Sequence, residues 1–246
     1  MLEDFKSVSI NSTMLLNQPK EGYRYNSDTL LLYDFISSFN PKGTLIDIGC
    51  GCGILGLLLK RDFPSLLVHL LDIQEQNCAL SLQNAQQNNL AIESLTCKDF
   101  LTATFEQKFD FIVSNPPFYH AGVVKSTNQS LSISRHSSYL PFEKLAQKAT
   151  KVLSNKGYLC FCYDAKQIDG VMYALLANKL NVEDVCFVHP KADKEASLVL
   201  IRARKNSKSL CKVHPPIIIY EDEIFAKRVQ TIFDRSQTKS HTCTLA

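Results

Sequence analysis

Hydrophobic and polar positions alternate along this chain in blocks that predict strands and helices in turn. Short apolar runs at residues 43–49, 66–71 and 109–114 predict buried strands. Segments 54–61 and 75–88, which follow the first two runs, carry leucine and alanine at helical spacing. Strands that alternate with helices predict an α/β fold with a parallel sheet and helices on both of its faces.

The second half of the chain continues this alternation and then departs from it. Residues 141–153 and 168–180 predict helices, with a strand at 158–163 between them. Two adjacent strands are expected at about 182–188 and 196–203. Because no helix separates this last pair, we expect a doubly wound, mostly parallel sheet with an antiparallel strand near one edge. The binding crevice of such a sheet lies at the carboxyl ends of its strands.

Composition narrows the class of protein. Hydrophobic residues make up 45% and charged residues 21%, as in soluble globular domains. No apolar run approaches the roughly 18 to 20 residues of a membrane-spanning helix, and the acidic start Met1–Phe5 is unlike a secretory signal. We therefore expect a cytoplasmic protein. The nine cysteines include no Cys-x-x-Cys pair and the six histidines are scattered, so we expect free thiols and no metal.

Charge is distributed unevenly between the two halves. Residues 1–119 carry 8 lysines and arginines against 13 acidic residues, a net charge of −5. Residues 120–246 carry 19 against 11, a net charge of +8. A basic half suits a polyanionic partner such as a nucleic acid, although an ordinary solvated face gives the same excess.

A glycine-rich loop, Asp47–Gly53, follows the first predicted strand. Glycines at alternate positions let the backbone turn sharply and approach a ligand closely. Gly51, Gly53 and Gly56 also satisfy the dinucleotide pattern Gly-x-Gly-x-x-Gly, so the loop alone does not choose between a nicotinamide cofactor and a methyl donor. Asp72, 19 residues beyond Gly53 at a strand end, supplies a carboxylate for the ribose hydroxyls of either cofactor, or caps the next helix.

The run Asn-Pro-Pro-Phe-Tyr at residues 115–119 decides between these cofactors. The exocyclic amine of a base is a weak nucleophile, because its lone pair is delocalised into the ring. Two acceptors that hold its hydrogens favour its attack on a methyl sulfonium, and the Asn115 amide and Pro116 carbonyl provide them. Phe118 offers a face on which an extruded base stacks. We therefore predict Asn115, Pro116 and Phe118 as the catalytic residues, with Pro117 and Tyr119 as further contacts to the base.

At these residues the chain resembles the class I S-adenosylmethionine-dependent methyltransferases that have an Asn-Pro-Pro-(Phe/Tyr) motif. The runs 18–32, 135–136, 187–197 and 215–220 are similar to the tRNA1(Val) (adenine-37 N6)-methyltransferase family. The resemblance implies a Rossmann-like fold, S-adenosyl-L-methionine as cofactor and methyl transfer to adenine N6 in a tRNA. No obligate protein partner is evident.

The same resemblance implies the cofactor-binding residues, which are Asp47, Gly49, Gly51, Gly53, Asp72, Asp99, Phe100, Tyr25, Asp28 and Thr29. Asp47 and the three glycines are expected at the methionine and ribose, Asp72 at the ribose, and Asp99 with Phe100 at the adenine. Tyr25, Asp28 and Thr29 are expected to belong to an N-terminal cover. Cys50 and Cys52 depart from the family's loop, where small or hydroxyl residues are usual; we interpret both as small fillers.

Further residues are expected to bind the RNA. Arg135 and His136 are assigned to phosphate contact or loop positioning, because methyl transfer from a sulfonium does not require a base. Lys191 and Lys194 are expected to contact the RNA backbone, although a solvated turn is an equal interpretation of these two lysines.

The chain is expected to divide into three segments. Residues 1–40 form an N-terminal cofactor-covering segment, 41–235 the methyltransferase domain, and 236–246 a tail.

Other functions remain open from the sequence. Guanine N2 methylation of ribosomal RNA is the first, because Asn115–Phe118 followed by His120 is also similar to that family. Protein glutamine N5 methylation is the second, since it also presents an amide nitrogen to this motif. Cytosine C5 transfer is disfavoured, because it needs a nucleophilic cysteine in this loop. A binding module without turnover is disfavoured by the complete glycine loop and Asn115.

Overall fold

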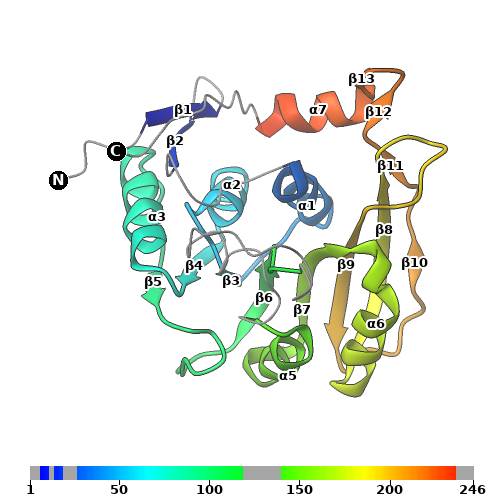
Figure 1. Ribbon diagram of the computed structural model, residues 1–246. Helices are drawn as coiled ribbons and strands as arrows, with labels where there is room; N and C mark the ends of the chain where they lie inside the picture. The colour runs from blue at the N-terminus through cyan, green and yellow to red at the C-terminus, as the bar shows by residue number, and fades with distance from the viewer. Residues whose placement is uncertain (1–5, 11–13, 19–26, 119–139, 237–246) are drawn as a thin grey trace, which may run out of the picture.

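The computed structural model describes residues 6–10, 14–18, 27–118 and 140–236 of the chain. A mostly parallel sheet runs through the middle of the molecule, with helices on both of its faces (Figure 1). In spatial order its strands are β5 (Ser94–Cys97), β4 (Leu67–Asp72), β3 (Thr44–Ile48), β6 (Phe109–Ser114), β7 (Leu153–Asp164), β9 (Leu198–Lys205), β8 (Leu180–His189) and β10 (Lys212–Val213). Strand β11 (Ile217–Ile218) also pairs with β8.

The directions of these strands confirm the expected α/β fold. Strands β5, β4, β3, β6 and β7 are parallel to one another, and β9 is antiparallel to both of its neighbours, β7 and β8. Ile48 of β3 lies beside Leu71 of β4 and Ser114 of β6. Because these three strands end at the same level, the loops that follow them meet at one edge of the sheet.

Each face of the sheet is covered by its own set of helices (Figure 1). One face carries α1 (Ser27–Ser37), α2 (Ile54–Asp62) and α3 (Glu75–Gln87), and the other carries α5 (Phe142–Val152), the short 3-10 helix η1 (Ala165–Gln167) and α6 (Ile168–Ala177). Helix α5 buries Phe142, Leu145 and Ala149, which are three or four residues apart, and exposes Lys144 and Lys151. This spacing is that of an amphipathic helix with one apolar stripe.

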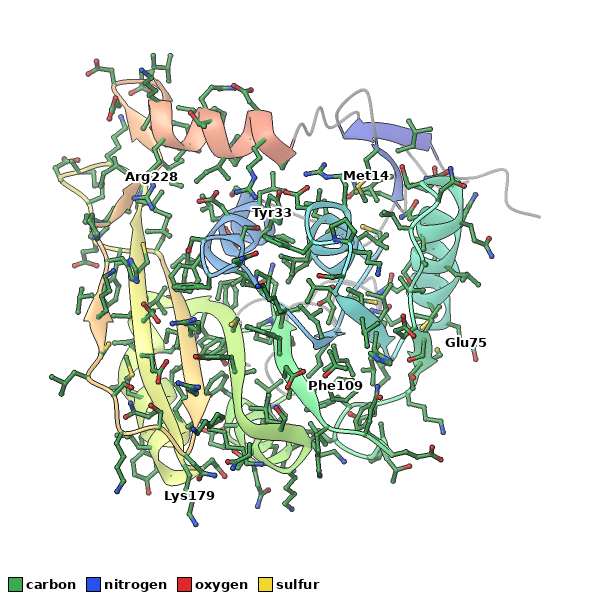
Figure 2. The ribbon with its side chains drawn as sticks, turned by 180° about the vertical axis from the view of Figure 1, so that it is seen from behind. Met14, Tyr33, Glu75, Phe109, Lys179 and Arg228 are labelled. Carbon is green, nitrogen blue, oxygen red and sulfur yellow. The ribbon has the colours of Figure 1, made fainter. Side chains whose placement is uncertain are left out.

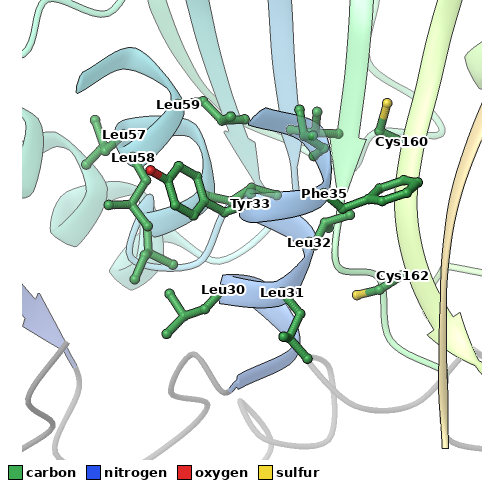
Figure 3. Close-up of a cluster of buried hydrophobic side chains, with 14 of the residues drawn as sticks. Leu30, Leu31, Leu32, Tyr33, Phe35, Leu57, Leu58, Leu59, Cys160 and Cys162 are labelled. Atoms are coloured by element: carbon green, nitrogen blue, oxygen red, sulfur yellow. The ribbon is translucent and has the colours of Figure 1, made fainter. Parts of the chain in front are cut away.

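Helix α1 is buried on nearly every side. Within Thr29–Ser37 every residue except Asp34 is buried. Figure 3 shows Tyr33 pointing toward Leu57 of α2, whereas Phe35 points toward β7 on the opposite side of the helix. Because almost no position of α1 is exposed, its sequence has no polar face to mark it as an amphipathic helix.

Helix α7 (Lys227–Ser236) lies across the outer side of α1 (Figures 1 and 2). Val229 and Ile232 are buried beneath it. At its end the Arg235 guanidinium pairs with Asp34 at 3.4 Å and lies 5.2 Å from the ring centre of Tyr33. The last described helix therefore packs on the first.

Two hairpins lie outside the main sheet. Strands β1 (Lys6–Ile10) and β2 (Met14–Gln18) pair antiparallel, as do β12 (Tyr220–Glu221) and β13 (Ile224–Phe225). The side chain of Asn84 on α3 binds both backbone groups of Asn17, accepting from its N–H at 2.7 Å and donating to its carbonyl at 3.0 Å. The first hairpin is thereby attached along α3.

The structure confirms the expected elements of the central sheet and adds others. Strand β5, helices α1 and α7 and both hairpins have no counterpart in the sequence prediction. Strand β7 begins at Leu153 rather than at 158, because α5 passes directly into it. Among the described residues, no helix combines the length and the apolar character required to cross a bilayer.

Candidate active site

A cavity lies where β3, β4 and β6 end, and its empty volume, including the part open to solvent, is about 670 Å³. The predicted residues that line it are Gly49, Gly51, Asp72, Asp99, Phe100, Asn115, Pro116 and Pro117. A smaller neighbouring cavity of about 390 Å³ includes Thr29 and Asp47 in its lining. Asn115 and the loop glycines Gly49 and Gly51 line both cavities, and so form the wall between them.

The glycine loop after β3 depends on left-handed backbone conformations. Gly49, Gly51 and Gly53 have φ of 67°, 57° and 86°. A Cβ at Gly49 or Gly51 would meet no atom within 4 Å, so the space beside their backbone is open. A Cβ at Gly53 would instead lie 3.0 Å from the Cβ of Ser81. Gly53 thus permits close packing at the start of α2 and lines neither cavity.

Asp72 at the end of β4 connects two loops at the edge of the cavity. Its Oδ2 accepts from the N–H of Gly51 at 2.9 Å, and its Oδ1 accepts from the N–H of Gln74 at 2.9 Å and the amide of Asn77 at 3.1 Å. Burial raises the pKa of this carboxyl above its ordinary value, and the hydrogen bonds from these neighbours oppose the shift. Asp72 therefore holds the glycine loop as well as facing the cavity.

Asp47 at the end of β3 is buried and faces the smaller cavity. Its Oδ2 accepts from the N–H of Gly56 at 2.9 Å. Burial raises the pKa of Asp47 to about 7, opposed by the Gly56 hydrogen bond and reinforced by the charge of Asp72. A Cβ on Gly56 would lie 2.6 Å from the Leu70 side chain, so this glycine serves close packing of α2 on the sheet.

Asp99 and Phe100 follow β5 and complete one wall of the larger cavity. The Oδ1 of Asp99 accepts from the N–H of Leu101 at 2.8 Å, which orders the turn after the strand. Phe100 is buried and supplies an apolar surface. The structure thus brings both residues to the cavity that contains Asp72, as the sequence predicts.

Asn115 is the first residue after β6 and is held at both ends of its amide. Its Nδ2 donates to the Oγ1 of Thr29 at 3.0 Å, and its Oδ1 accepts from the thiol of Cys162 at 3.1 Å. Thr29 is in the first turn of α1, whereas Cys162 is on β7. Asp28, beside Thr29, is partly buried and raises the pKa of the Cys162 thiol, in addition to the larger effect of burial.

The loop after Asn115 packs into the fold rather than projecting from it. Pro116 is buried, while Pro117 and Phe118 are partly buried. The ring of Phe118 lies 5.7 Å from that of Tyr163, and its carbonyl accepts from the Gln167 amide at 2.9 Å. Phe118 is therefore supported by β7 and η1 and does not line the larger cavity in this structure.

Several residues that hydrogen-bond to the site were not predicted from the sequence. Asn84 donates to the carbonyl of Cys52 at 2.8 Å and so connects α3 and the first hairpin to the glycine loop. Gln167 and Cys162 were also missed. The signal for Asn84 is its spacing of seven residues from Asn77, which places two asparagines on one face of α3. Nothing in the local sequence marks Cys162.

Some of the predicted site residues lie outside the described residues or away from the two cavities. Tyr25, Tyr119, Arg135 and His136 lie outside the described residues. The structure places Lys191 and Lys194 in the loop after β8, separated from Asn115 by strands β7 and β9.

Both of these lysines have acidic neighbours. Lys191 pairs with Glu223 at 2.7 Å, and Lys194 lies 3.4 Å from Asp193. Cys50 and Cys52 are buried, and burial raises the pKa of both thiols, to about 12 for Cys52. Both cysteines therefore carry neutral thiols at neutral pH, and their sizes suit the interior of the loop.

Comparison with known proteins gives the family. Residues 25–180 match the methyltransferase small domain family. The chain is 28% identical over 175 residues to a tRNA1(Val) (adenine(37)-N6)-methyltransferase from Pedobacter heparinus, with 70% of this chain and 73% of that protein covered. It is 30% identical over 126 residues to a release factor glutamine methyltransferase from Flavobacterium psychrophilum, with 48% and 44% covered.

The fold is shared with solved structures. A predicted O-methyltransferase from Agrobacterium tumefaciens superimposes with a TM-score of 0.66 at 15% identity, and the match covers 87% of this chain and 99% of that chain. At this identity the likeness shows the Rossmann-like fold of class I methyltransferases. The family match extends from the segment before α1 to the start of β8 and includes the glycine loop, Asp72 and Asn115. The chain belongs to the methyltransferase small domain family.

Proposed function

We propose that this protein transfers a methyl group from S-adenosylmethionine to the N6 amine of an adenine in a tRNA. The observation that carries the proposal is the position of Asn115, whose amide lies between a large cavity and a smaller one at the carboxyl edge of the sheet. The relative from Pedobacter heparinus supports the choice of adenine N6 and of tRNA. A tRNA substrate supports a cytoplasmic location for this protein.

The chain's residues fit the cofactor. Gly49 and Gly51 present backbone without side chains to open space, as close approach of a ligand requires. The carboxylates of Asp72 and Asp47 suit a ligand that carries a sulfonium and an ammonium charge. Asp72 holds the ribose, and Asp99 with Phe100 contacts the adenine. When bound, S-adenosylmethionine supplies an electrophilic methyl group.

Asn115 and Pro116 prepare the acceptor amine. The Oδ1 of Asn115 and the carbonyl of Pro116 accept its two hydrogens, which favours a pyramidal nitrogen with its lone pair available for attack. No side chain is needed as a base, because the methylated amine is acidic enough to lose its proton to water. Phe118, with Pro117 and Tyr119, supports the extruded base by apolar contact and stacking.

The RNA is proposed to bind through the basic half of the chain. We assign Arg135 and His136 to phosphate contact or loop positioning. Lys191 and Lys194 lie at the carboxyl edge of the sheet, the edge at which Asn115 also lies, and contact the RNA backbone. Their acidic neighbours Glu223 and Asp193 reduce the charge that this loop offers.

The test is substitution of Asn115 with measurement of methyl transfer to a tRNA transcript. Asn115→Ala should lower kcat roughly 100-fold or more, as expected for loss of one preorganised polar partner, and leave cofactor affinity near the wild-type value. Asn115→Asp, which keeps acceptor oxygens of similar size, should retain more activity than Asn115→Ala. A wild-type rate for Asn115→Ala would show that this loop does not bind the acceptor amine.

Protein glutamine N5 methylation is the second candidate, favoured by the similarity to the release factor methyltransferase. A glutamine amide nitrogen is also a poor nucleophile and requires the same two acceptors. Incubation of the enzyme and labelled cofactor with unmodified total tRNA, ribosomal RNA and release factor, each in turn, separates the candidates. Label in N6-methyladenosine of tRNA supports the first proposal, whereas label in glutamine or in guanine N2 overturns it.

A further inference from the structure

The amide of Asn115 is hydrogen-bonded at both ends to side chains from distant parts of the chain. Thr29 is 86 residues away in sequence and Cys162 is 47 residues away, yet each lies within hydrogen-bond distance. Helix α1 brings the first and strand β7 brings the second. Neither Thr29 nor Cys162 belongs to the glycine loop or to the Asn-Pro-Pro motif.

The contact with Cys162 distinguishes the two ends of the amide. Rotation of an asparagine side chain by half a turn exchanges its oxygen for its NH2 group, and only the oxygen accepts a hydrogen bond. A thiol is a hydrogen-bond donor and only a weak acceptor, so Cys162 selects the oxygen. The hydroxyl of Thr29 accepts from the NH2 group at the other end and holds it in place. Because a hydroxyl can donate as well as accept, the preference for one of the two orientations comes from Cys162.

The thiol of Cys162 keeps its hydrogen in this position. The residue has a relative exposure of 0%, and burial raises its pKa well above the ordinary value, with Asp28 adding to the effect. A neutral thiol retains the S–H that the Asn115 oxygen accepts. An amide oxygen has two lone pairs and can accept from the thiol and from the acceptor amine together.

We propose that Cys162 and Thr29 are positioning residues, which hold the Asn115 amide in the orientation that presents its oxygen to the acceptor amine. The proposal rests on the function proposed above, since it takes Asn115 as the acceptor of that amine. Without these contacts the flipped amide becomes populated, in which an NH2 group faces the amine and repels its hydrogens.

Cys162→Ala tests the first contact, with Cys160→Ala as the matched control. Both cysteines are buried on β7 two residues apart, so they share a face of the strand (Figure 3). We expect Cys162→Ala to lower kcat about 3- to 10-fold, as for loss of one neutral hydrogen bond, with unchanged cofactor affinity and unchanged KM for RNA. Cys160→Ala should cost similar stability and leave kcat unchanged, while Cys162→Ser, which keeps a donor, should recover most of the rate.

Thr29→Val and Thr29→Ser test the second contact. Valine keeps the branched shape and removes the acceptor, so kcat should fall about 3- to 10-fold, whereas serine keeps the hydroxyl and should recover most of the rate. The double variant with Cys162→Ala should fall less than the product of the two single effects, because both act on one side chain. A kcat for both single variants equal to wild type overturns the proposal.

The S–H stretching band gives a readout independent of activity. In infrared difference spectra the Cys162 band is the one lost in Cys162→Ala, and it should move to higher frequency in Asn115→Ala, where its acceptor is absent. A band that does not move overturns the positioning proposal even if kcat changes. If Asn115→Ala loses activity while Cys162→Ala and Thr29→Val do not, positioning fails and the proposed function stands. If Asn115→Ala methylates at the wild-type rate, both fail.

Discussion

Gly51 adopts a left-handed backbone conformation at the edge of the cavity, with open space where a Cβ would be. Gly51→Ala should therefore destabilise the fold by about 1 to 2 kcal/mol through backbone strain alone. It should also weaken cofactor binding, because the methyl group projects into space that the ligand approaches. Gly170→Ala is the control, since Gly170 is exposed in α6 with ordinary φ and nothing within 4 Å. Thermal unfolding and calorimetry of both variants check this.

Asp72 faces the cavity with a carboxylate that also holds the glycine loop. Asp72→Ala should weaken S-adenosylmethionine binding by about 1 to 3 kcal/mol, the usual loss for hydrogen bonds to a charged group. Asp72→Asn keeps one acceptor oxygen for the backbone of Gly51 or Gln74 and should lose less affinity. Calorimetry on folded protein is the measurement. Unchanged affinity in Asp72→Ala would reject its assignment to the ribose.

Asp47 predicts a pH dependence of stability with a definite sign. Its pKa is about 7 in the folded protein, against an ordinary value near 4 when unfolded. Its contribution to stability is therefore fully present below about pH 4 and is lost as the pH rises to 7. Between about pH 4 and pH 7 the free energy of unfolding of the wild type should fall by about 4 kcal/mol relative to that of Asp47→Asn. Urea unfolding of both proteins at several pH values measures the difference, and parallel pH profiles would contradict it.

The chemistry of single residues was partly visible in the sequence. Gly51, Asp72 and Asn115 could be predicted because each belongs to a local pattern that follows a buried strand. Thr29 was expected at the cofactor; it lines the smaller cavity, and its hydroxyl also accepts from the Asn115 amide, a contact that the sequence did not indicate. Cys162 gave no signal, because its role depends on contact with a residue on another strand, and sequence spacing does not record such contacts.

At the scale of elements, the parallel strands were the easiest to predict. Buried parallel strands are continuous apolar runs, and β3, β4 and β6 show this directly. Strand β5 was missed because it is short and none of its four residues is buried. Helix α1 was missed because burial on all sides removes the alternation that identifies a surface helix.

The packing of α7 on α1 predicts that the buried side of α7 contributes to the stability of the protein. Ile232→Ala leaves a cavity under α7 and should lower the free energy of unfolding by about 2 to 5 kcal/mol, whereas Thr231→Ala on the exposed side of the same helix should change it by less than about 0.5 kcal/mol. Urea unfolding checks both variants. Equal stabilities would show that α7 does not support the core.

At the scale of the whole molecule, the −5 and +8 charges of the two halves predict salt-dependent binding of RNA. Neutralising Lys191 and Lys194 should flatten the dependence of affinity on salt by about one phosphate contact each. Lys179→Gln is the control, because Lys179 lies exposed at the opposite end of β8 (Figure 2). Filter binding at several salt concentrations measures the slopes. An unaltered slope in the double variant would place the RNA on another face.

The contact between α1 and α7 also concerns the synthesis of the protein on the ribosome. Helix α1, which carries Thr29, leaves the exit tunnel about 200 residues before α7 does. Until α7 has been synthesised, the side of α1 that packs against it lacks this cover. A message truncated just before residue 227 would encode every residue of the proposed catalytic centre. Its product would nevertheless leave that side of α1 exposed, and we expect chaperones and proteases to recognise it.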